Sequence, residues 1–275
     1  MAMAIVLVLI VVGSVLFHLL SPWWWTPIAT NWGRIDDTMI ITFWISGAAF
    51  AAVVLFMASC VFRFRHKEGA QAAYRPENRG LESSLAVGTA VGVAVILAPG
   101  LAVWRDFVTP PPEAADVEVV GQQWQWSYRL PGKDGKLGAA ETRFVSDKNP
   151  LGLNPYDTNG RDDLVISGGD LHLPVGKPVK VLLRSIDVIH NFYVPEFRAK
   201  MDLMPGIVTQ FWITPTKVGT FEVLCAGFCG VGHPQMRGAV VVEPESDYRK
   251  WLGAQKTFSQ IADANSEAKG RLSKR

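Results

Sequence analysis

The sequence predicts a membrane-anchored all-β protein, in which N-terminal transmembrane helices precede a single β-sandwich or barrel. Three observations support this prediction. The first 108 residues contain long segments without charge, and the following residues form short strand-like runs separated by glycine and proline. A cluster of sulfur and imidazole side chains lies between the last two runs. The formal net charge of the 275 residues is +2, which gives no sign of a nucleic-acid partner.

The helical region is predicted over residues 1–108, because three of its segments carry no charged side chain. About 20 apolar residues suffice for one crossing of a bilayer. The predicted spans lie at about residues 3–20, 38–62 and 83–107. The first segment has two interpretations, a cleaved secretion signal or a retained helix. It lacks a basic start and a small-residue cleavage site, so we favour a retained third span.

The loops between the spans predict the orientation. Residues 63–82 carry five arginine and lysine side chains, whereas residues 21–37 carry only Arg34 beside two aspartates. Basic loops remain on the cytoplasmic side of a membrane. We therefore predict a multi-pass protein of the bacterial inner membrane, with its C-terminal domain on the periplasmic or equivalent outer face.

The outer domain is predicted over residues 109–245. The prolines of Thr109–Pro112 end the third span, since proline stops a helix. Short runs rich in β-branched and aromatic residues then predict strands at 117–120, 164–166, 179–183, 209–213, 219–224 and 238–242. Residues 131–163 are rich in turn-forming residues and predict a long loop. Residues 246–275 predict a short helix followed by a basic tail.

A cluster of metal-binding side chains lies between the last two predicted strands. Cys225, Cys229, His233 and Met236 share one short loop, and His190 lies upstream. Thiolate, imidazole and thioether are soft ligands that suit copper better than magnesium or calcium. From the residues alone, a disulfide, a Cys2His2 zinc site and a mononuclear copper site are alternatives. A mononuclear copper site needs one thiolate, so the second cysteine favours two bridged copper ions.

Nearly all of residues 21–245 resemble one protein family. Four motifs carry the similarity: Gly121–Tyr128, Val188–Phe192, Lys200–Gly206 and Cys225–Met236. Together they resemble subunit II of the haem-copper cytochrome c oxidases, which carries a binuclear copper A centre. The resemblance implies a cupredoxin-like fold for the outer domain, with the metal loop between its last two strands.

The resemblance also implies a cofactor of two copper ions. Cys225 and Cys229 would bridge both ions. His190 and Met236 would complete one of them. The implied ligands of the other are His233 and the backbone carbonyl of Gly227.

Gly227 departs from the pattern of the family. Most members carry a glutamate there, whose side chain reaches a magnesium ion at the interface with subunit I. Glycine has no such oxygen. The expectation is therefore copper at this loop and no magnesium ligand from position 227.

Two tryptophans lie in the first of the four motifs. The resemblance implies that Trp124 lies on the outer surface, where electrons enter from cytochrome c, whereas Trp126 is expected in the core. Three acidic residues of the predicted long loop have two interpretations, a docking site for the lysines of cytochrome c or an ordinary solvated loop: Asp157, Asp162 and Asp163.

Glu82 precedes the third span at its predicted cytoplasmic end. The resemblance implies a position at the mouth of a proton channel into subunit I. The alternative is a negative charge that the dipole at a helix N-terminus favours. The Trp-Thr pair that usually follows this glutamate in the family is absent here.

The expected function is the electron-accepting subunit of a respiratory haem-copper terminal oxidase. It would take electrons from cytochrome c, or a similar small carrier, and pass them to haem in subunit I, with subunit III as a further partner. The chain itself shows no catalytic haem site. A copper A subunit of a haem-copper nitric oxide reductase is the alternative. A quinol oxidase subunit lacks the copper ligands, and a copper carrier lacks the paired cysteines with the aromatic motif.

Overall fold

The computed structural model describes residues 1–21, 26–69, 71, 74 and 76–264. It divides into two compact units. The first comprises Met1–Thr26 and Arg34–Trp104, and the second comprises Pro27–Gly33 and Arg105–Arg275. The second unit thus begins four residues before the predicted boundary at 109 and includes a segment that precedes the second span. Residues 265–275 of the predicted basic tail lie outside the described residues.

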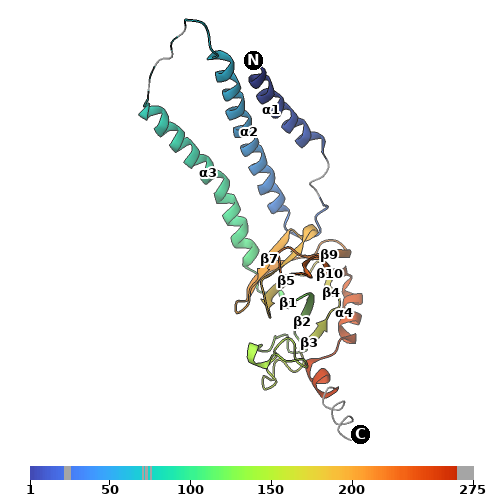
Figure 1. Cartoon of the computed structure of the whole chain (residues 1–275). Helices are drawn as coiled ribbons and strands as arrows, with labels where there is room; N and C mark the ends of the chain where they lie inside the picture. The colour runs from blue at the N-terminus through green and yellow to red at the C-terminus, as the bar shows by residue number, and fades with distance from the viewer. Residues whose placement is uncertain (22–25, 70, 72–73, 75, 265–275) are drawn as a thin grey trace. The chain divides into compact units, whose positions relative to one another are not determined.

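The first unit consists of helices (Figure 1): α1 spans Ala2–Leu20, α2 spans Gly33–Arg63 and α3 spans Arg79–Val108. All three are long and apolar enough to cross a membrane. Most of their apolar side chains are exposed, as expected where lipid and not water surrounds them. The three predicted spans fall within these helices. The protein is therefore membrane-anchored.

The second unit is a β-sandwich of two five-stranded sheets. The first sheet has the order β3-β2-β1-β5-β8, with bounds Leu164–Ser167, Gln125–Leu130, Ala115–Gln122, Val179–Ser185 and Thr209–Ile213. The second has the order β4-β10-β9-β6-β7, with bounds Leu171–Pro174, Arg237–Glu243, Gly219–Cys225, His190–Val194 and Ala199–Leu203. Among the strands of the described residues, the β1–β5 and β10–β4 ladders are parallel and the other ladders are antiparallel. The predicted all-β class is confirmed, although β2, β4, β6 and β7 are not among the six predicted strand runs.

The strand β1 is buried on both of its faces. Val119 and Val120 are neighbours on opposite faces, and both are almost completely buried. Val120 packs against Leu151 and Leu153 of the long 131–163 segment. This segment therefore covers the outer face of its sheet, and it contributes to the core.

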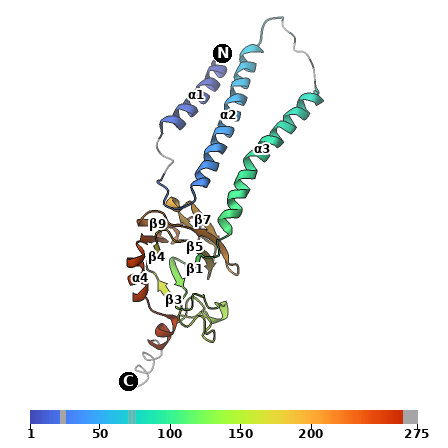
Figure 2. The same ribbon diagram turned by 180° about the vertical axis from the view of Figure 1, so that it is seen from behind.

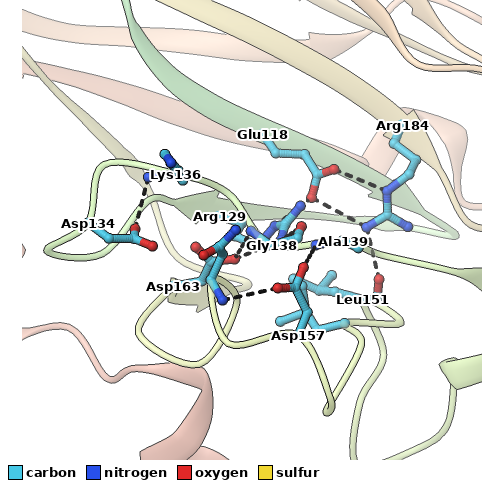
Figure 3. A network of polar contacts seen from close by, with 12 residues as sticks. Glu118, Arg129, Asp134, Lys136, Gly138, Ala139, Leu151, Asp157, Asp163 and Arg184 are labelled. Carbon is cyan, nitrogen blue, oxygen red and sulfur yellow. Dashed lines mark hydrogen bonds and ion pairs between the residues drawn. The ribbon is translucent and has the colours of Figure 1, made fainter.

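A buried network of charges fixes the same segment to the sheet (Figure 3). Arg129 donates to Glu118 over 2.9 Å and to Asp163 over 2.7 Å, and Arg184 donates to Glu118 over 3.2 Å. Arg129 and Arg184 also donate to the backbone carbonyls of Gly138 and Leu151. The side chains of Glu118, Arg129 and Asp163 are at most 6% exposed. One ion-pair network thus links β1, β2 and β5 to the long segment.

The three aspartates considered for docking, Asp157, Asp162 and Asp163, each make contacts that hold the segment together. The prediction of a solvated or docking role is wrong for Asp163, which is completely buried. Burial raises the pKa of Asp163 to about 6 despite the neighbouring Arg129. Asp162 accepts from the backbone N–H of Lys133, and Asp157 accepts from that of Ala139. Their carboxylates hold the turns of the segment in place.

An aromatic clamp packs on β8 of the sandwich; it consists of Trp32, Phe107, Phe211 and Trp212. Phe107 stacks on Phe211 with ring centroids 5.1 Å apart, and Trp32 lies edge-on to Phe107 at 5.2 Å. Trp32 Nε1 donates to the Trp212 carbonyl over 2.7 Å. The clamp explains why residues 27–33 and 105–108 belong to the second unit.

The predicted C-terminal helix is α4, Glu245–Ala254. Both views place it beside β4 (Figures 1 and 2). Trp251 stacks on His172 of β4 with ring centroids 4.3 Å apart, and His172 Nδ1 lies 2.8 Å from Glu243 of β10. The helix is thereby attached to the edge of the second sheet.

Candidate metal centre

Strand pairing brings the distant histidine to the cysteine loop. His190 is the first residue of β6, and Cys225 is the last residue of β9. The two strands are antiparallel, with Phe192 opposite Cys225. The ladder continues as Ala226 N–H donates to the Asn191 carbonyl, so Gly227 arrives beside His190. The remaining predicted ligands follow in the β9–β10 connection.

The predicted ligand atoms converge on the two thiols. The Sγ atoms of Cys225 and Cys229 lie 3.7 Å apart, far beyond the S–S bond length of about 2.05 Å. His190 Nδ1 lies 3.9 Å from Cys225 Sγ, and His233 Nδ1 lies 3.5 Å from Cys229 Sγ.

The two weaker predicted ligands also reach the sulfur pair. Met236 Sδ lies 3.9 Å from Cys229 Sγ, and the Gly227 carbonyl oxygen lies 3.2 Å from Cys225 Sγ. His190, Cys225 and Cys229 alone offer three ligand atoms within 4.8 Å of one another. The set is soft, buried and arranged around a sulfur pair, and it therefore fits copper.

Asp187 orients His190, a role that the sequence interpretation missed. Its Oδ1 lies 2.8 Å from His190 Nε2, and a carboxylate can only accept, so the proton lies on Nε2. The Nδ1 lone pair then faces the sulfur atoms. Burial works to raise the pKa of Asp187, but hydrogen bonds from Gln123, His190 and Val188 hold it below its ordinary value. The orienting group is therefore ionised at neutral pH.

The thiols need to lose their protons before they bind a metal. Burial, together with the neighbouring Cys225, raises the pKa of Cys229 to about 11. At neutral pH the metal-free Cys229 thiol is therefore protonated. Metal binding releases that proton, so we expect the apparent copper affinity to fall as the pH is lowered.

Trp124 connects the surface to the sulfur pair. Its side chain is 39% exposed, and its Nε1 donates to the Cys229 carbonyl over 3.3 Å. Gln123 Nε2 donates to the same carbonyl over 2.8 Å. A Cβ at Gly232 would lie 2.3 Å from the indole, so only glycine there lets the ring pack flat on the loop. Trp126, by contrast, is buried, with its ring 6.3 Å from that of His190.

Gly227 leaves little space for a side chain. A Cβ there would lie 3.3 Å from Asn191 Cβ, which requires a shift of a few tenths of an ångström. The Gly227 φ angle is not positive, so an L-residue is not strained there. The predicted ligand at this position is the carbonyl, which a substitution preserves.

We expect Gly227→Ala to bind as much copper as the wild type. One added methyl group in a tight site costs about 1 kcal/mol or slightly more. Metal analysis and the copper EPR spectrum of the purified complex measure the outcome. A lower copper content than that of the wild type would show that the side-chain space, and not only the carbonyl, matters at this position.

Glu82 lies in the first unit, at the beginning of α3. Its carboxylate accepts from the Asn78 backbone N–H over 3.4 Å, and Asn78 Oδ1 accepts from the Leu81 N–H over 3.1 Å. This is a reciprocal helix cap. The contacts of Glu82 among the described residues therefore fit the alternative in which its negative charge stabilises the N-terminus of a helix.

The two units define a membrane-anchored protein whose cupredoxin-like domain carries a ligand set for copper. Residues 115–244 match the family described as cytochrome c oxidase subunit II, periplasmic domain. The alternative cytochrome c oxidase subunit 2 of Bradyrhizobium diazoefficiens is 65% identical over 271 residues, which cover 98% of each chain. The chain therefore belongs to the cytochrome c oxidase subunit 2 family.

Two further proteins are similar to this chain. The cytochrome c oxidase subunit 2 of Cereibacter sphaeroides is 28% identical over 238 residues, 82% of this chain and 77% of that one. The solved periplasmic domain of subunit II of cytochrome oxidase (CoxB) from Bradyrhizobium japonicum covers 53% of this chain and 95% of that chain. Its sequence identity is 26% and its TM-score is 0.39.

Proposed function

We propose that this chain takes electrons one at a time from cytochrome c at a binuclear copper A centre. It passes them to haem in subunit I, where oxygen is reduced. The observation that carries the proposal is the pair of thiols 3.7 Å apart with one imidazole nitrogen beside each. Membership of the oxidase subunit 2 family supports the same function.

The residues of the site favour rapid electron transfer over bond chemistry. When bound, two copper ions would supply a one-electron redox couple. Six residues would hold it: Cys225, Cys229, His190, Met236, His233 and, through its carbonyl, Gly227. The first four are at most 9% exposed, and His233 is half-buried. Burial excludes water, and the Asp187 contact fixes the imidazole, so little rearrangement accompanies a change of charge.

Trp124 is the proposed point at which electrons enter. Its exposed ring is available to a donor, and its N–H contacts the backbone of Cys229 directly. An electron that enters at the Trp124 ring would therefore cross the hydrogen bond to the Cys229 carbonyl and then Cys229 itself to reach the Cys229 sulfur. No acidic residue of the 131–163 segment is needed in this route.

We expect Trp124→Phe to slow copper reduction by cytochrome c about 10- to 100-fold, the range typical for groups that support metal ligands. Phenylalanine keeps a ring but loses the N–H that contacts Cys229. The copper spectrum should stay unchanged, because Trp124 is not a ligand. Rapid-mixing absorbance of the purified complex measures the reduction rate.

Two further variants control this experiment. Trp251→Phe makes the same chemical change on α4 and should leave the rate unchanged. Gly232→Ala keeps the Trp124 indole but forces it from its position, so it should reproduce the slow reduction with copper retained. A wild-type rate in Trp124→Phe would exclude this tryptophan from the route.

The proposed setting is the bacterial inner membrane, with the copper domain on the periplasmic face and subunits I and III as partners. The basic 63–82 loop supports this orientation.

A proton role for Glu82 remains a proposal from the resemblance. Glutamine can still accept the hydrogen bond from the Asn78 N–H, so Glu82→Gln should keep the helix cap. Proton uptake by this variant therefore tests the proton role separately from the capping role.

A copper A subunit of a nitric oxide reductase is the second candidate, and Gly227 is the observation that favours it. The absence of a carboxylate at this position removes the magnesium ligand that most oxidase relatives supply. Turnover of the purified complex on oxygen and on nitric oxide separates the two functions. Manganese EPR of complex from manganese-grown cells tests the magnesium expectation independently.

A further inference from the structure

The first unit contains an apolar groove between α1 and α2. Ala4 of α1 and Ala58 of α2 are buried, whereas most of their neighbours are exposed. Such small side chains allow membrane helices to approach closely. A groove of about 410 Å³ adjoins this contact, and its walls are almost entirely apolar, with Val8, Leu55 and Phe62 among them.

The groove ends in a hollow lined by cations. This hollow has a volume of about 390 Å³ and shares Ser59 and Phe62 with the groove, so the two are continuous. The rest of its lining is a basic cluster: Arg63, Arg65 and Lys67. An apolar channel thus leads directly to three positive charges at the end of α2.

The basic cluster has no carboxylate partner among the described residues. Arg65 lies over the Phe62 ring at 5.2 Å, and its Nη1 donates only to the Met1 sulfur over 3.0 Å, a weak acceptor. Glu68 follows the cluster in sequence but forms no ion pair with it. The charges are therefore available to an anion from outside the chain.

We propose that the groove and the basic cluster bind one anionic phospholipid of the leaflet at the Arg63 end. The acyl chains lie in the apolar groove, and the headgroup phosphate contacts Arg63, Arg65 and Lys67. Basic hollows between membrane helices select such headgroups. An apolar protein helix would fill the groove equally well but would leave the three cations without a partner.

Native mass spectrometry of the intact complex tests this site. The complex is released from nanodiscs that contain equal amounts of phosphatidylglycerol and phosphatidylcholine. We expect the wild-type complex to retain phosphatidylglycerol over phosphatidylcholine by about tenfold or more, because each juxtamembrane cation adds to the attraction.

Three variants define the site. Combined Arg63→Gln, Arg65→Gln and Lys67→Gln should abolish the preference. Ser59→Trp, which fills the junction of groove and hollow, should lower retention of both lipids. The matched control removes three cations from the other unit, through Arg249→Gln, Lys250→Gln and Lys256→Gln, and should behave as wild type. Copper content and oxygen turnover verify that each variant is folded and assembled.

Loss of the preference in the first variant, with the control unchanged, supports the proposal. Equal retention of the two lipids by the wild type would overturn it, and so would a preference that survives removal of the basic cluster. A complex that retains no lipid, but cross-links to another subunit through Ser59→Cys, would also overturn it in favour of a protein occupant.

Discussion

Cys225→Ser is expected to destroy the proposed binuclear copper site and to lower turnover with cytochrome c by more than about a hundredfold. Loss of a group that merely supports a metal ligand costs about 10- to 100-fold, so loss of a bridging ligand should cost more. Serine replaces a soft thiolate with a hydroxyl that copper binds poorly. The seven-line EPR pattern of one electron shared by two copper nuclei should disappear from the purified complex.

Cys60→Ser is the matched control. Cys60 is also a free cysteine, and it lies in α2 outside the site. This variant should keep the shared EPR pattern and the wild-type turnover. A wild-type complex with a four-line spectrum from a single copper would contradict the binuclear assignment, as would a Cys225→Ser complex that keeps the shared pattern.

Arg129→Met is expected to destabilise the outer domain by about 3–5 kcal/mol. The substitution leaves Glu118 and Asp163 buried without their shared guanidinium, and the Gly138 carbonyl loses its donor. An unpaired buried charge costs more than the ion pair contributed. For a unit of this size, the melting temperature should fall by about 6–20 °C. Differential scanning calorimetry of the solubilised complex measures the change.

Arg143→Met makes the same substitution at the surface, in the 131–163 segment. Arg143 lies 2.8 Å from Glu141, yet the two side chains are 69% and 40% exposed. Exposed pairs contribute about 0–1 kcal/mol, so this variant should melt near the wild type. An equal fall in melting temperature in the two variants would mean that burial does not govern the strength of the Arg129 ion-pair network.

The candidate metal ligands could be recognised in the sequence because most of them are close together. Four of the side chains share residues 225–236, and their donor chemistry favours a soft metal over magnesium or calcium. Asp187 could not be predicted in its role, because the contact of its carboxylate with His190 depends on the turn before β6. The need for glycine at position 232 could not be predicted either, because the Trp124 ring that packs on it comes from the β1–β2 turn, which is distant in sequence.

The fold was predictable where patterns are local and strong. Long uncharged segments indicated the helices, and runs of β-branched residues indicated most of the strands. The role of Asp163 was missed because a single sequence does not show that Arg129 and Gly138 approach it. β2 was missed because Gln125–Leu130 mixes polar and apolar residues although nearly all of them are buried.

The aromatic clamp has a practical consequence for anyone who prepares the outer domain without its helices. A soluble fragment that starts at residue 109 omits both Phe107 and Trp32, and it leaves the rings of Phe211 and Trp212 facing water. Such newly exposed apolar patches promote aggregation. A fragment that starts at Arg105 keeps the Phe107 ring, and a tethered Pro27–Gly33 peptide would restore the rest. The boundary for truncation is therefore set by packing, and the prolines at 110–112 are a poor guide to it.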